Sequence, residues 1–275
     1  MRRARSTPPA MVPPQPRTTR LDTVVAERSG VTRSHARSLI MAGRVRVNGR
    51  ALTKPGTTVP IDAVVEIERP RPYVSRGGEK LEAALEAFNI DPAGLHALDI
   101  GASTGGFTDC LLQRGVANVV AVDVGYGQID LKLRDDPRVT VVERTNFRTL
   151  PDNAFPDGFD LIVADASFIS LRTILRRAIS YLREGGTIVA LLKPQFEAGR
   201  ERLGGGGVVR DPQTHSDVLR EFRDAAPGLG LGVVAAIVSP LRGPAGNVEF
   251  LLELRRGENM LADGDIERLV EEAHG

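Results

Sequence analysis

The feature that most constrains the fold is a glycine-rich turn between an apolar run and a helical pattern. The run Ala97–Ile100 contains an acid, Asp99, the turn 101–106 carries three glycines, and apolar residues at helical spacing begin at Phe107. Glycines allow backbone to approach a ligand closely, and a helix N-terminus offers it unpaired N–H groups. The stretch is typical of an α/β protein that binds a nucleotide-like molecule at the end of a strand.

After the turn, apolar runs alternate with helical patterns, which predicts a parallel, doubly wound α/β sheet of seven strands. The expected strands are 97–100, 119–123, 139–142, 161–165, 187–193, 231–238 and 249–254. The expected helices are 79–88, 106–114, 128–134, 170–182 and 212–225. Only a loop joins the last two strands, which predicts an antiparallel hairpin at one edge of the sheet.

Composition places the chain among soluble globular proteins, with 275 residues, 41% hydrophobic and 26% charged. Its single cysteine, Cys110, is expected to be a buried packing residue, and four scattered histidines predict no metal site. No run approaches the roughly 20 apolar residues that cross a bilayer, and the N-terminus lacks the apolar core of a secretory signal. We therefore expect a cytoplasmic monomer without a membrane partner.

Charge is divided unevenly along the chain. Residues 1–76 contain 15 Lys/Arg and 5 Asp/Glu, whereas the remainder contains 21 and 30. The split predicts a polyanion-binding module joined to a different body, although a solvated basic face with a basic tail would give the same count. Residues 1–19, rich in proline and arginine, are expected to form a disordered basic tail, and residues 258–275 an acidic C-terminal helix or tail.

The basic region has the pattern of a small α+β domain over residues 20–68. Helices are expected over 20–27 and 32–42, then a hairpin at Asn48-Gly49 and a strand over 64–67. The stretches RLDTVVAE, TRSHARSLIMAGRVRVNG and KPG resemble the S4-like RNA-binding module. That resemblance implies RNA contacts from Arg20, Arg33, Arg37, Arg44, Arg46, Lys54 and, in the linker 69–78, Arg76. A helix pair with a hairpin that binds no RNA stays open as the alternative.

The glycine turn itself matches neither GxGxxG nor the phosphate-binding GxxxxGK[ST] motif. Instead, LDIGASTGGF resembles the first motif of S-adenosylmethionine-dependent methyltransferases. Asp123, at a strand end, could accept both ribose hydroxyls, although a dehydrogenase would use it likewise. Asn146 could recognise the adenine edge or be a turn residue. The predicted cofactor residues are Asp99, Gly101, Ala102, Ser103, Gly105, Gly106, Phe107, Asp123, Val124, Asn146 and Asp165.

Four charged residues carry the next prediction, and the three at strand ends are expected to converge beside this turn. Asp165 and Lys193 end strands, Glu249 begins one, and Lys80 follows the linker. The set resembles that of the FtsJ-like ribose 2′-O-methyltransferases. The resemblance implies that Lys193 activates the ribose hydroxyl and that Asp165 and Glu249 orient the groups and balance charge. Lys80 would either hold the substrate or adjust the pKa of Lys193. Each residue alone could be a surface charge, but a lysine ending an apolar strand is unusual.

Over residues 20–256 the chain resembles the TlyA family, which joins these two modules. Further matching stretches are YVSRGGEKLEAALEAF, VDVGYGQ, LKPQFEAGRE, GGVVRDP and SPLRGPAGNVEFLLELRR. The resemblance implies a Rossmann-like methyltransferase domain over 79–257 that methylates a cytidine ribose of ribosomal RNA in ribosomal subunits, with S-adenosylmethionine as methyl donor. The alternatives are a haemolysin, a non-enzymatic ribosome-assembly factor and a dehydrogenase. The glycine-rich loop 196–210 is expected either to close over the target nucleotide or to be a plain surface loop.

Overall fold

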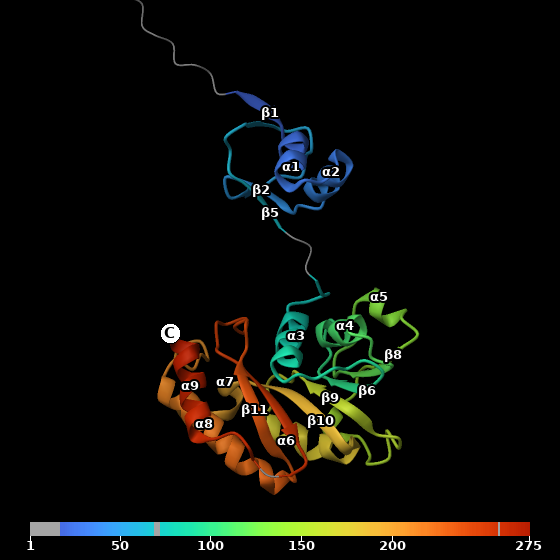
Figure 1. Ribbon diagram of the computed structural model, residues 1–275, viewed down its shortest axis with the longest axis vertical. Helices are drawn as coiled ribbons and strands as arrows, with labels where there is room; N and C mark the ends of the chain where they lie inside the picture. Colours follow the sequence, from blue (N-terminus) through green and yellow to red (C-terminus); the bar gives the residue numbers. More distant parts are fainter. Residues whose placement is uncertain (1–16, 69–71, 258) are drawn as a thin grey trace, which may run out of the picture. The chain divides into compact units, whose positions relative to one another are not determined.

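The chain folds as two units that divide between residues 70 and 71, inside the predicted linker. The computed structural model describes residues 17–68, 72–257 and 259–275, and Figure 1 shows both units. Each unit has its own hydrophobic core. Residues 69–71 of the predicted linker lie outside the described residues, and its last two residues belong to the first helix of the second unit.

The first unit packs two helices against short antiparallel strands. Its elements are β1 (Thr18–Arg20), α1 (Leu21–Ser29), α2 (Arg33–Met41), β2 (Val45–Val47), β3 (Arg50–Ala51), β4 (Thr58–Pro60) and β5 (Val65–Ile67). Leu21, Val25 and Ile40 are fully buried in its core. Asn48 and Gly49 both have positive φ, as the predicted tight hairpin turn between β2 and β3 requires.

One strand pair in this unit corrects the prediction of a disordered tail over residues 1–19. Thr18–Arg20 forms β1, which pairs antiparallel with β4. Three residues are too few to show an alternating pattern, and the pairing joins segments about forty positions apart, so neither strand left a sequence signal. The rest of the predicted tail, residues 1–16, lies outside the described residues.

The second unit is built on a seven-stranded sheet in the order β11-β12-β10-β9-β6-β7-β8. Its strands are β6 (His96–Ile100), β7 (Asn118–Val122), β8 (Val139–Val142), β9 (Phe159–Ala164), β10 (Leu182–Leu192), β11 (Gly232–Val238) and β12 (Phe250–Arg255). All neighbouring pairs are parallel except those of β12, which is antiparallel to both β10 and β11. The predicted doubly wound sheet with an antiparallel hairpin at its edge is confirmed.

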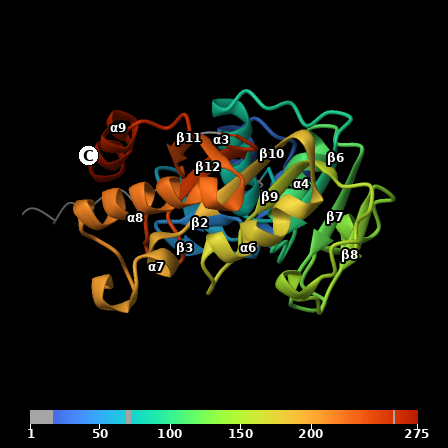
Figure 2. The same cartoon turned by 90° about the horizontal axis from the view of Figure 1, so that it is seen from below.

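Helices cover both faces of this sheet, as Figure 2 shows from a second direction. The helices are α3 (Gly77–Ala87), α4 (Gly106–Gln113), α5 (Leu131–Arg134), α6 (Leu171–Ala178), α7 (Pro194–Glu197), α8 (Pro212–Ala225) and α9 (Asp263–His274), with 3₁₀ turns η1 (Phe147–Thr149), η2 (Ile179–Tyr181), η3 (Arg200–Arg202) and η4 (Ala226–Leu229). One core joins α3, α4 and α5 to the sheet, and the other joins α6, α8 and α9. Cys110 is fully buried in α4, as predicted.

Two predicted helices are shorter in the structure. The helix expected over 128–134 begins only at Leu131, because the Asp130 side chain accepts a hydrogen bond from the Lys132 N–H and caps it there. The helix expected over 170–182 ends at Ala178 and continues as the 3₁₀ turn η2. Strand β10 then begins at Leu182, five residues earlier than predicted, with an irregularity in its register before Thr187.

The expected C-terminal helix is present as α9, but the second unit extends past the predicted boundary at residue 257 and includes it. Helix α9 packs against α8 and β11, and its Ile266 is fully buried in the core shared with α6 and α8. The acidic residues dominate the composition of this segment, whereas the apolar ones recur at helical spacing on a single buried face. The segment is therefore part of the second unit rather than a tail.

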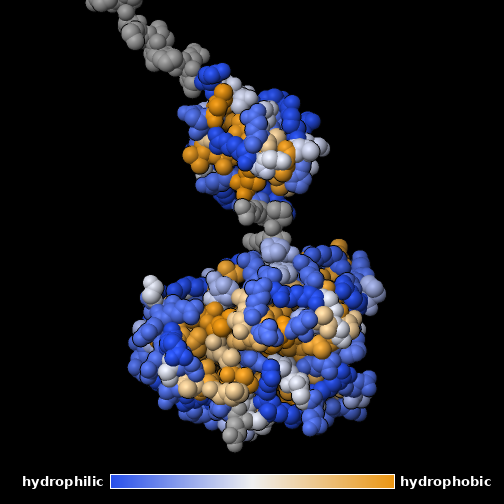
Figure 3. All heavy atoms as spheres, viewed as in Figure 1, coloured by the Kyte–Doolittle hydropathy of each residue, from blue (hydrophilic) through white to orange (hydrophobic). Residues whose placement is uncertain are grey.

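The surface of the second unit mixes polar and apolar side chains. Figure 3 shows apolar residues across the middle of the drawn face, over the region where Figure 1 draws the sheet, bordered by hydrophilic residues. Within the described residues, no helix combines the length and the apolar character that a membrane span needs.

The order of strands creates a crevice between β6 and β9. From β6 the chain proceeds outward to β7 and β8, and then returns to the other side of β6 to form β9 and β10. The N–H of Asp165 donates to the carbonyl oxygen of Ile100, 3.0 Å away, and fixes the two strand ends side by side. Ligands of open α/β sheets bind at such a reversal, outside the carboxyl ends of the strands.

We expect Ile266→Ala to lower the free energy of unfolding of the second unit by about 2–5 kcal/mol, because it leaves a cavity under α9. Glu271→Ala, on the exposed side of the same helix, is the matched control and should change it by less than about 0.5 kcal/mol. Urea unfolding of the full chain measures both. Equal stability of the two variants would contradict the inclusion of α9 in the core.

Candidate active site

The glycine turn after β6 is shaped by two close approaches of backbone to neighbouring segments. Gly101 has φ +84°, and a Cβ atom there would lie 2.6 Å from the carbonyl oxygen of Asp165. A Cβ atom at Gly106 would lie 2.2 Å from the Ser75 hydroxyl oxygen. Only glycine fits both positions, so the turn lies flat against the end of β9 and the segment before α3.

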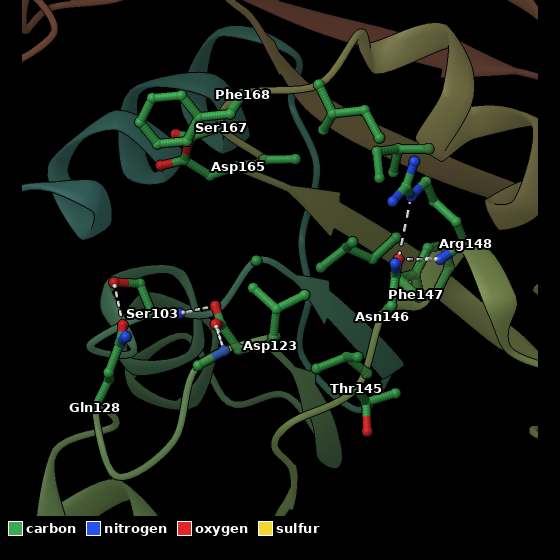
Figure 4. Close-up of a pocket in the computed structure, with 18 residues that line it drawn as sticks. Ser103, Asp123, Gln128, Thr145, Asn146, Phe147, Arg148, Asp165, Ser167 and Phe168 are labelled. Atoms are coloured by element: carbon green, nitrogen blue, oxygen red, sulfur yellow. Dashed lines mark hydrogen bonds between the residues drawn. The ribbon is translucent and has the colours of Figure 1, made fainter.

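A first pocket of about 580 Å³ opens beside this turn (Figure 4). Asp123, directly after β7, accepts hydrogen bonds from the Ser103 N–H (2.8 Å) and the Gly125 N–H (2.6 Å). These bonds hold the carboxylate at the edge of the pocket, with its remaining lone pairs available to a ligand. Apolar walls come from Val122, Phe147, Ile169 and Ile174, among others.

Asn146 lines the same pocket, and its side chain also has a local role. Its Oδ1 accepts hydrogen bonds from the N–H and the Nε of Arg148, both 3.2 Å away, and thereby caps the 3₁₀ turn η1. The turn interpretation therefore describes the structure, while an adenine contact from the same side chain stays a prediction.

A second pocket of about 330 Å³ adjoins the first and brings the four predicted catalytic residues together. The two pockets share Gly101, Ser103, Asp165 and Ser167. The second is lined in addition by Lys80, Lys193 and Glu249, which come from segments up to 169 positions apart. A ligand that fills the first pocket can thus extend past the glycine turn toward all four charged groups.

These four residues form two ion pairs. The Lys193 Nζ lies 2.6 Å from Asp165 Oδ1 and donates to the Ser167 hydroxyl oxygen at 2.8 Å. The Lys80 Nζ donates to Glu249 Oε2. Both lysine side chains are about 10% exposed, so the pairs lie where water screens them weakly. The geometry gives each ammonium nitrogen a fixed position.

Local packing explains the position of each pair. Lys193 directly follows β10 and Asp165 directly follows β9, so parallel neighbouring strands deliver both side chains to the same edge. Glu249 precedes β12 and is 1% exposed. A Cβ atom at Gly243 would lie 2.6 Å from Glu249 Oε1, so the loop before β12 packs directly on this carboxylate.

Sequence reasoning missed several residues of the site. Ser167, which holds Lys193, follows Asp165 by two positions, and that proximity was its only signal. Phe168 lines the first pocket, is 91% exposed and has φ +64°, a strained conformation for a bulky residue. Its ring centroid lies 5.4 Å from that of Phe196. Nothing in the one-dimensional pattern indicates this backbone conformation.

Some predicted cofactor residues lie outside both pockets. Asp99 is fully buried and accepts a hydrogen bond from the Thr108 hydroxyl at 2.7 Å. Burial raises the pKa of the Asp99 carboxyl to about 7. Gly105 precedes α4 with φ +94°. The other predicted cofactor residues line one or both pockets, the glycines with their backbone atoms. They are Gly101, Ala102, Ser103, Gly106, Phe107, Asp123, Val124, Asn146 and Asp165.

The residues predicted to bind RNA are distributed over both units. Six lie exposed on the first unit: Arg20, Arg33, Arg37, Arg44, Arg46 and Lys54. Arg76 belongs to the second unit, where it is exposed, precedes α3 and lines the second pocket. Arg76 therefore lies in the same pocket as the four charged residues.

The loop 196–210 is anchored at both ends. Glu197 accepts hydrogen bonds from the Leu171 N–H (2.6 Å) and the Ser170 hydroxyl (2.8 Å), which ties the start of the loop to α6. Near its end, the Val209 N–H donates to Asn247 Oδ1 at 3.0 Å. Among the described residues, none from this loop lines either pocket. Closure over a nucleotide therefore stays a prediction.

Comparison with known proteins defines the class. The sequence profile of the FtsJ-like methyltransferases matches residues 73–256, and that of the S4 domain matches residues 19–65. The protein is thus an FtsJ-like methyltransferase with an N-terminal S4 domain, which confirms the methyltransferase interpretation over the dehydrogenase alternative.

Individual relatives show which family of FtsJ-like methyltransferases the chain belongs to. The chain is 49% identical over 232 residues to the 16S/23S rRNA (cytidine-2′-O)-methyltransferase TlyA of Mycobacterium tuberculosis, covering 83% of this chain and 87% of the relative. It is 40% identical to hemolysin A of Brachyspira hyodysenteriae, covering 84% and 98%. A structure described as a hemolysin of Streptococcus thermophilus matches with TM-score 0.73 and 40% identity, covering 95% of this chain and 97% of that one. This chain belongs to the TlyA family.

We expect Asp99→Asn to change how stability depends on pH. Because the Asp99 carboxyl has a pKa of about 7 when folded and about 4 when unfolded, the folded state alone binds this proton between those values. The carboxyl therefore favours folding at low pH, and its contribution declines by up to about 1.4 kcal/mol per pH unit as pH rises from about 4 to 7.

Asn cannot titrate, so the variant should gain stability relative to the unsubstituted protein over that range, whatever their difference at pH 4. Urea unfolding at several pH values measures this. Parallel stability curves for the two proteins would show that the Asp99 carboxyl does not titrate as described.

Proposed function

We propose that this chain transfers a methyl group from S-adenosylmethionine to the ribose 2′-hydroxyl of a cytidine in ribosomal RNA. One observation carries the proposal: two lysine–carboxylate pairs, from Lys80, Asp165, Lys193 and Glu249, line a single pocket beside the glycine turn. A ribose hydroxyl is too weak an acid to react unaided, and paired lysines and carboxylates are groups that can bind it and take its proton.

The first pocket suits the nucleoside part of S-adenosylmethionine. Asp123 presents lone pairs to ribose hydroxyls, and apolar walls flank a planar base. The turn has no lysine to hold a phosphate, which agrees with a ligand that has none. When bound, S-adenosylmethionine supplies a methyl group on a sulfonium, and its transfer forms the O–CH₃ bond as the S–CH₃ bond breaks.

We assign the proton of the hydroxyl to the Lys193 amine. Asp165 and Ser167 fix its nitrogen from two sides. When an ammonium proton of Lys193 passes to the Asp165 carboxylate, the amine that remains can accept the hydroxyl proton. Glu249 fixes Lys80, whose Nζ can hold the ribose in place as the second lysine in the pocket. Removal of one partner from a buried pair leaves the other charge uncompensated, so all four residues are needed together.

The substrate assignment is supported by the first unit and by the relatives. The S4 domain carries the six exposed basic side chains that the sequence predicts to bind RNA, and basic surfaces bind RNA through its phosphates. The relatives from Mycobacterium tuberculosis and Campylobacter jejuni are both named as rRNA (cytidine-2′-O)-methyltransferases. We further propose that the protein acts in the cytoplasm, where ribosomal subunits are, and as a monomer, because one chain supplies all four charged residues.

Alkaline hydrolysis of the product RNA shows whether the methyl group is on a ribose or on a base. The full chain is incubated with tritiated S-adenosylmethionine and ribosomal subunits that lack modification, and the RNA is then hydrolysed in alkali. A 2′-O-methyl group blocks cleavage of the adjacent bond, so we expect the label in alkali-stable dinucleotides with cytidine at the 5′ position. Label in mononucleotides would indicate base methylation and contradict the proposal, as would label on another nucleoside or no label.

Lys193→Met should lower kcat for methyl transfer at least about a hundredfold, because the proton acceptor is lost. The dissociation constant for S-adenosylmethionine, measured by calorimetry, should change less than about threefold. Lys132→Met is the matched control, since Lys132 also forms an ion pair in the second unit, with Asp109 at 2.9 Å, but lies outside the pocket. Full transfer by Lys193→Met would refute the role of Lys193, and a variant without transfer that still restores ribosome assembly would favour the assembly-factor alternative.

A further inference from the structure

We propose that Asp22 is a positioning residue, which gathers the guanidinium groups of Arg20, Arg33 and Arg37 into one surface that binds backbone phosphates of the substrate RNA. The proposal rests on the proposed function, because it takes the S4 domain as the part that binds RNA. It adds a residue that bears the same sign of charge as RNA and would therefore be passed over in a search for RNA contacts.

The carboxylate lies under three guanidinium groups. Asp22 is 1% exposed, and Arg20 binds it in a fork, with Nε 3.0 Å from Oδ1 and the terminal nitrogen 2.7 Å from Oδ2. Arg33 donates to Oδ1 at 3.4 Å, and the Nε of Arg37 lies 3.9 Å from Oδ2. The three arginine side chains are 50%, 61% and 60% exposed. One buried acid thus has three exposed cations within 3.9 Å of its carboxylate oxygens.

Local structure fixes the acid first. Asp22 lies in the first turn of α1, where the helix dipole favours a negative charge, and its N–H donates to the Pro55 carbonyl oxygen at 3.0 Å. Arg33 and Arg37 are four residues apart on α2, so they share the face that packs beside α1. The cluster therefore depends on contacts of both helices and not on one flexible segment.

The stoichiometry argues against an ion pair that serves stability alone. One carboxylate balances only one of three positive charges, so the cluster retains a net charge of about +2. A carboxylate accepts about four hydrogen bonds, whereas three guanidinium groups carry about fifteen N–H donors. Most donors thus face solvent, as a phosphate-binding surface requires. Ordering the arginines beforehand reduces the entropy that they lose when RNA binds.

Arg28 of the same unit shows the contrast. Its guanidinium donates to the carbonyl oxygens of Ala63 (2.7 Å) and Ile61 (2.8 Å), so its terminal nitrogens serve the fold. The Arg20 guanidinium holds the pKa of the Asp22 carboxyl at about 2, so the acid stays charged at any pH at which RNA would be bound. The cluster is therefore a constant feature and not a pH-dependent one.

The decisive comparison is between Asp22→Asn and Asp62→Asn in the full chain. Both variants gain one positive charge on the same unit, but Asp62 is exposed and forms no ion pair among the described residues. Net charge alone predicts tighter RNA binding by both. The proposal predicts that Asp22→Asn binds an unmodified rRNA transcript at least about tenfold more weakly at 0.15 M salt, whereas Asp62→Asn binds as tightly as the unsubstituted protein or more tightly.

Two further readouts separate positioning from a structural role. The salt dependence of the binding constant should become shallower by about 0.7–0.9 for each phosphate contact that Asp22→Asn loses. Methyl transfer at saturating RNA should keep its kcat within about twofold while KM rises. Binding by Asp22→Asn equal to or tighter than that of the unsubstituted protein would overturn the proposal.

Arg33→Gln distinguishes failure of this proposal from failure of the proposed function. If Arg33→Gln binds RNA normally, the RNA-binding face is assigned wrongly and the positioning role falls with it. If Arg33→Gln weakens binding and Asp22→Asn does not, only the positioning role is refuted. Should Asp22→Asn fail to fold, Asp22→Glu decides: weaker RNA binding with unchanged kcat supports the role, and unchanged binding contradicts it.

Discussion

The contact between the glycine turn and the end of β9 is the constraint on which the catalytic unit depends. At Gly101 the backbone passes so close to the Asp165 carbonyl oxygen that a single added carbon would lie 2.6 Å from it. This approach places the edge of the first pocket directly beside Asp165, one of the four charged residues. The reversal of strand order between β6 and β9 makes it possible, because both strands end at the same edge.

Around that contact, segments that are far apart in the sequence are brought together by local packing. Lys193 and Asp165 pair because parallel neighbouring strands end at the same edge of the sheet. The carboxylate that pairs with Lys80, that of Glu249, is covered by the loop before β12. Because the lysine side chains are only about 10% exposed, removing one member of either pair would leave the other as an uncompensated buried charge. The site therefore combines stability and chemistry in the same interactions: the bonds that satisfy the buried charges also hold the two lysine nitrogens in place.

The sheet and the charged residues at its strand ends could be predicted from the sequence because each has a local signature, whereas Lys80 joined the set only through the resemblance to the FtsJ-like enzymes. Apolar runs that end in Asp165 or Lys193 indicate the ends of strands, and the carboxyl ends of the strands in a doubly wound sheet lie at the same edge. Other features depend on contacts that no local pattern encodes. The β1–β4 pair joins two three-residue segments. Helix α9 buries one apolar face although its segment is acidic in composition. The positive φ of Phe168 follows from tertiary contacts.

The same distinction applies to charge. The basic side chains on the S4 domain could be identified because the excess of arginine is visible in the composition. In a count of net charge, however, every acidic residue only reduces that excess. In the structure, Asp22 lies beneath the arginines that it appeared to oppose, and it limits where their guanidinium groups can be. An acid in a basic domain is thus informative when it is buried, because burial makes its partners converge. In both units, a buried carboxylate fixes the position of the cations beside it.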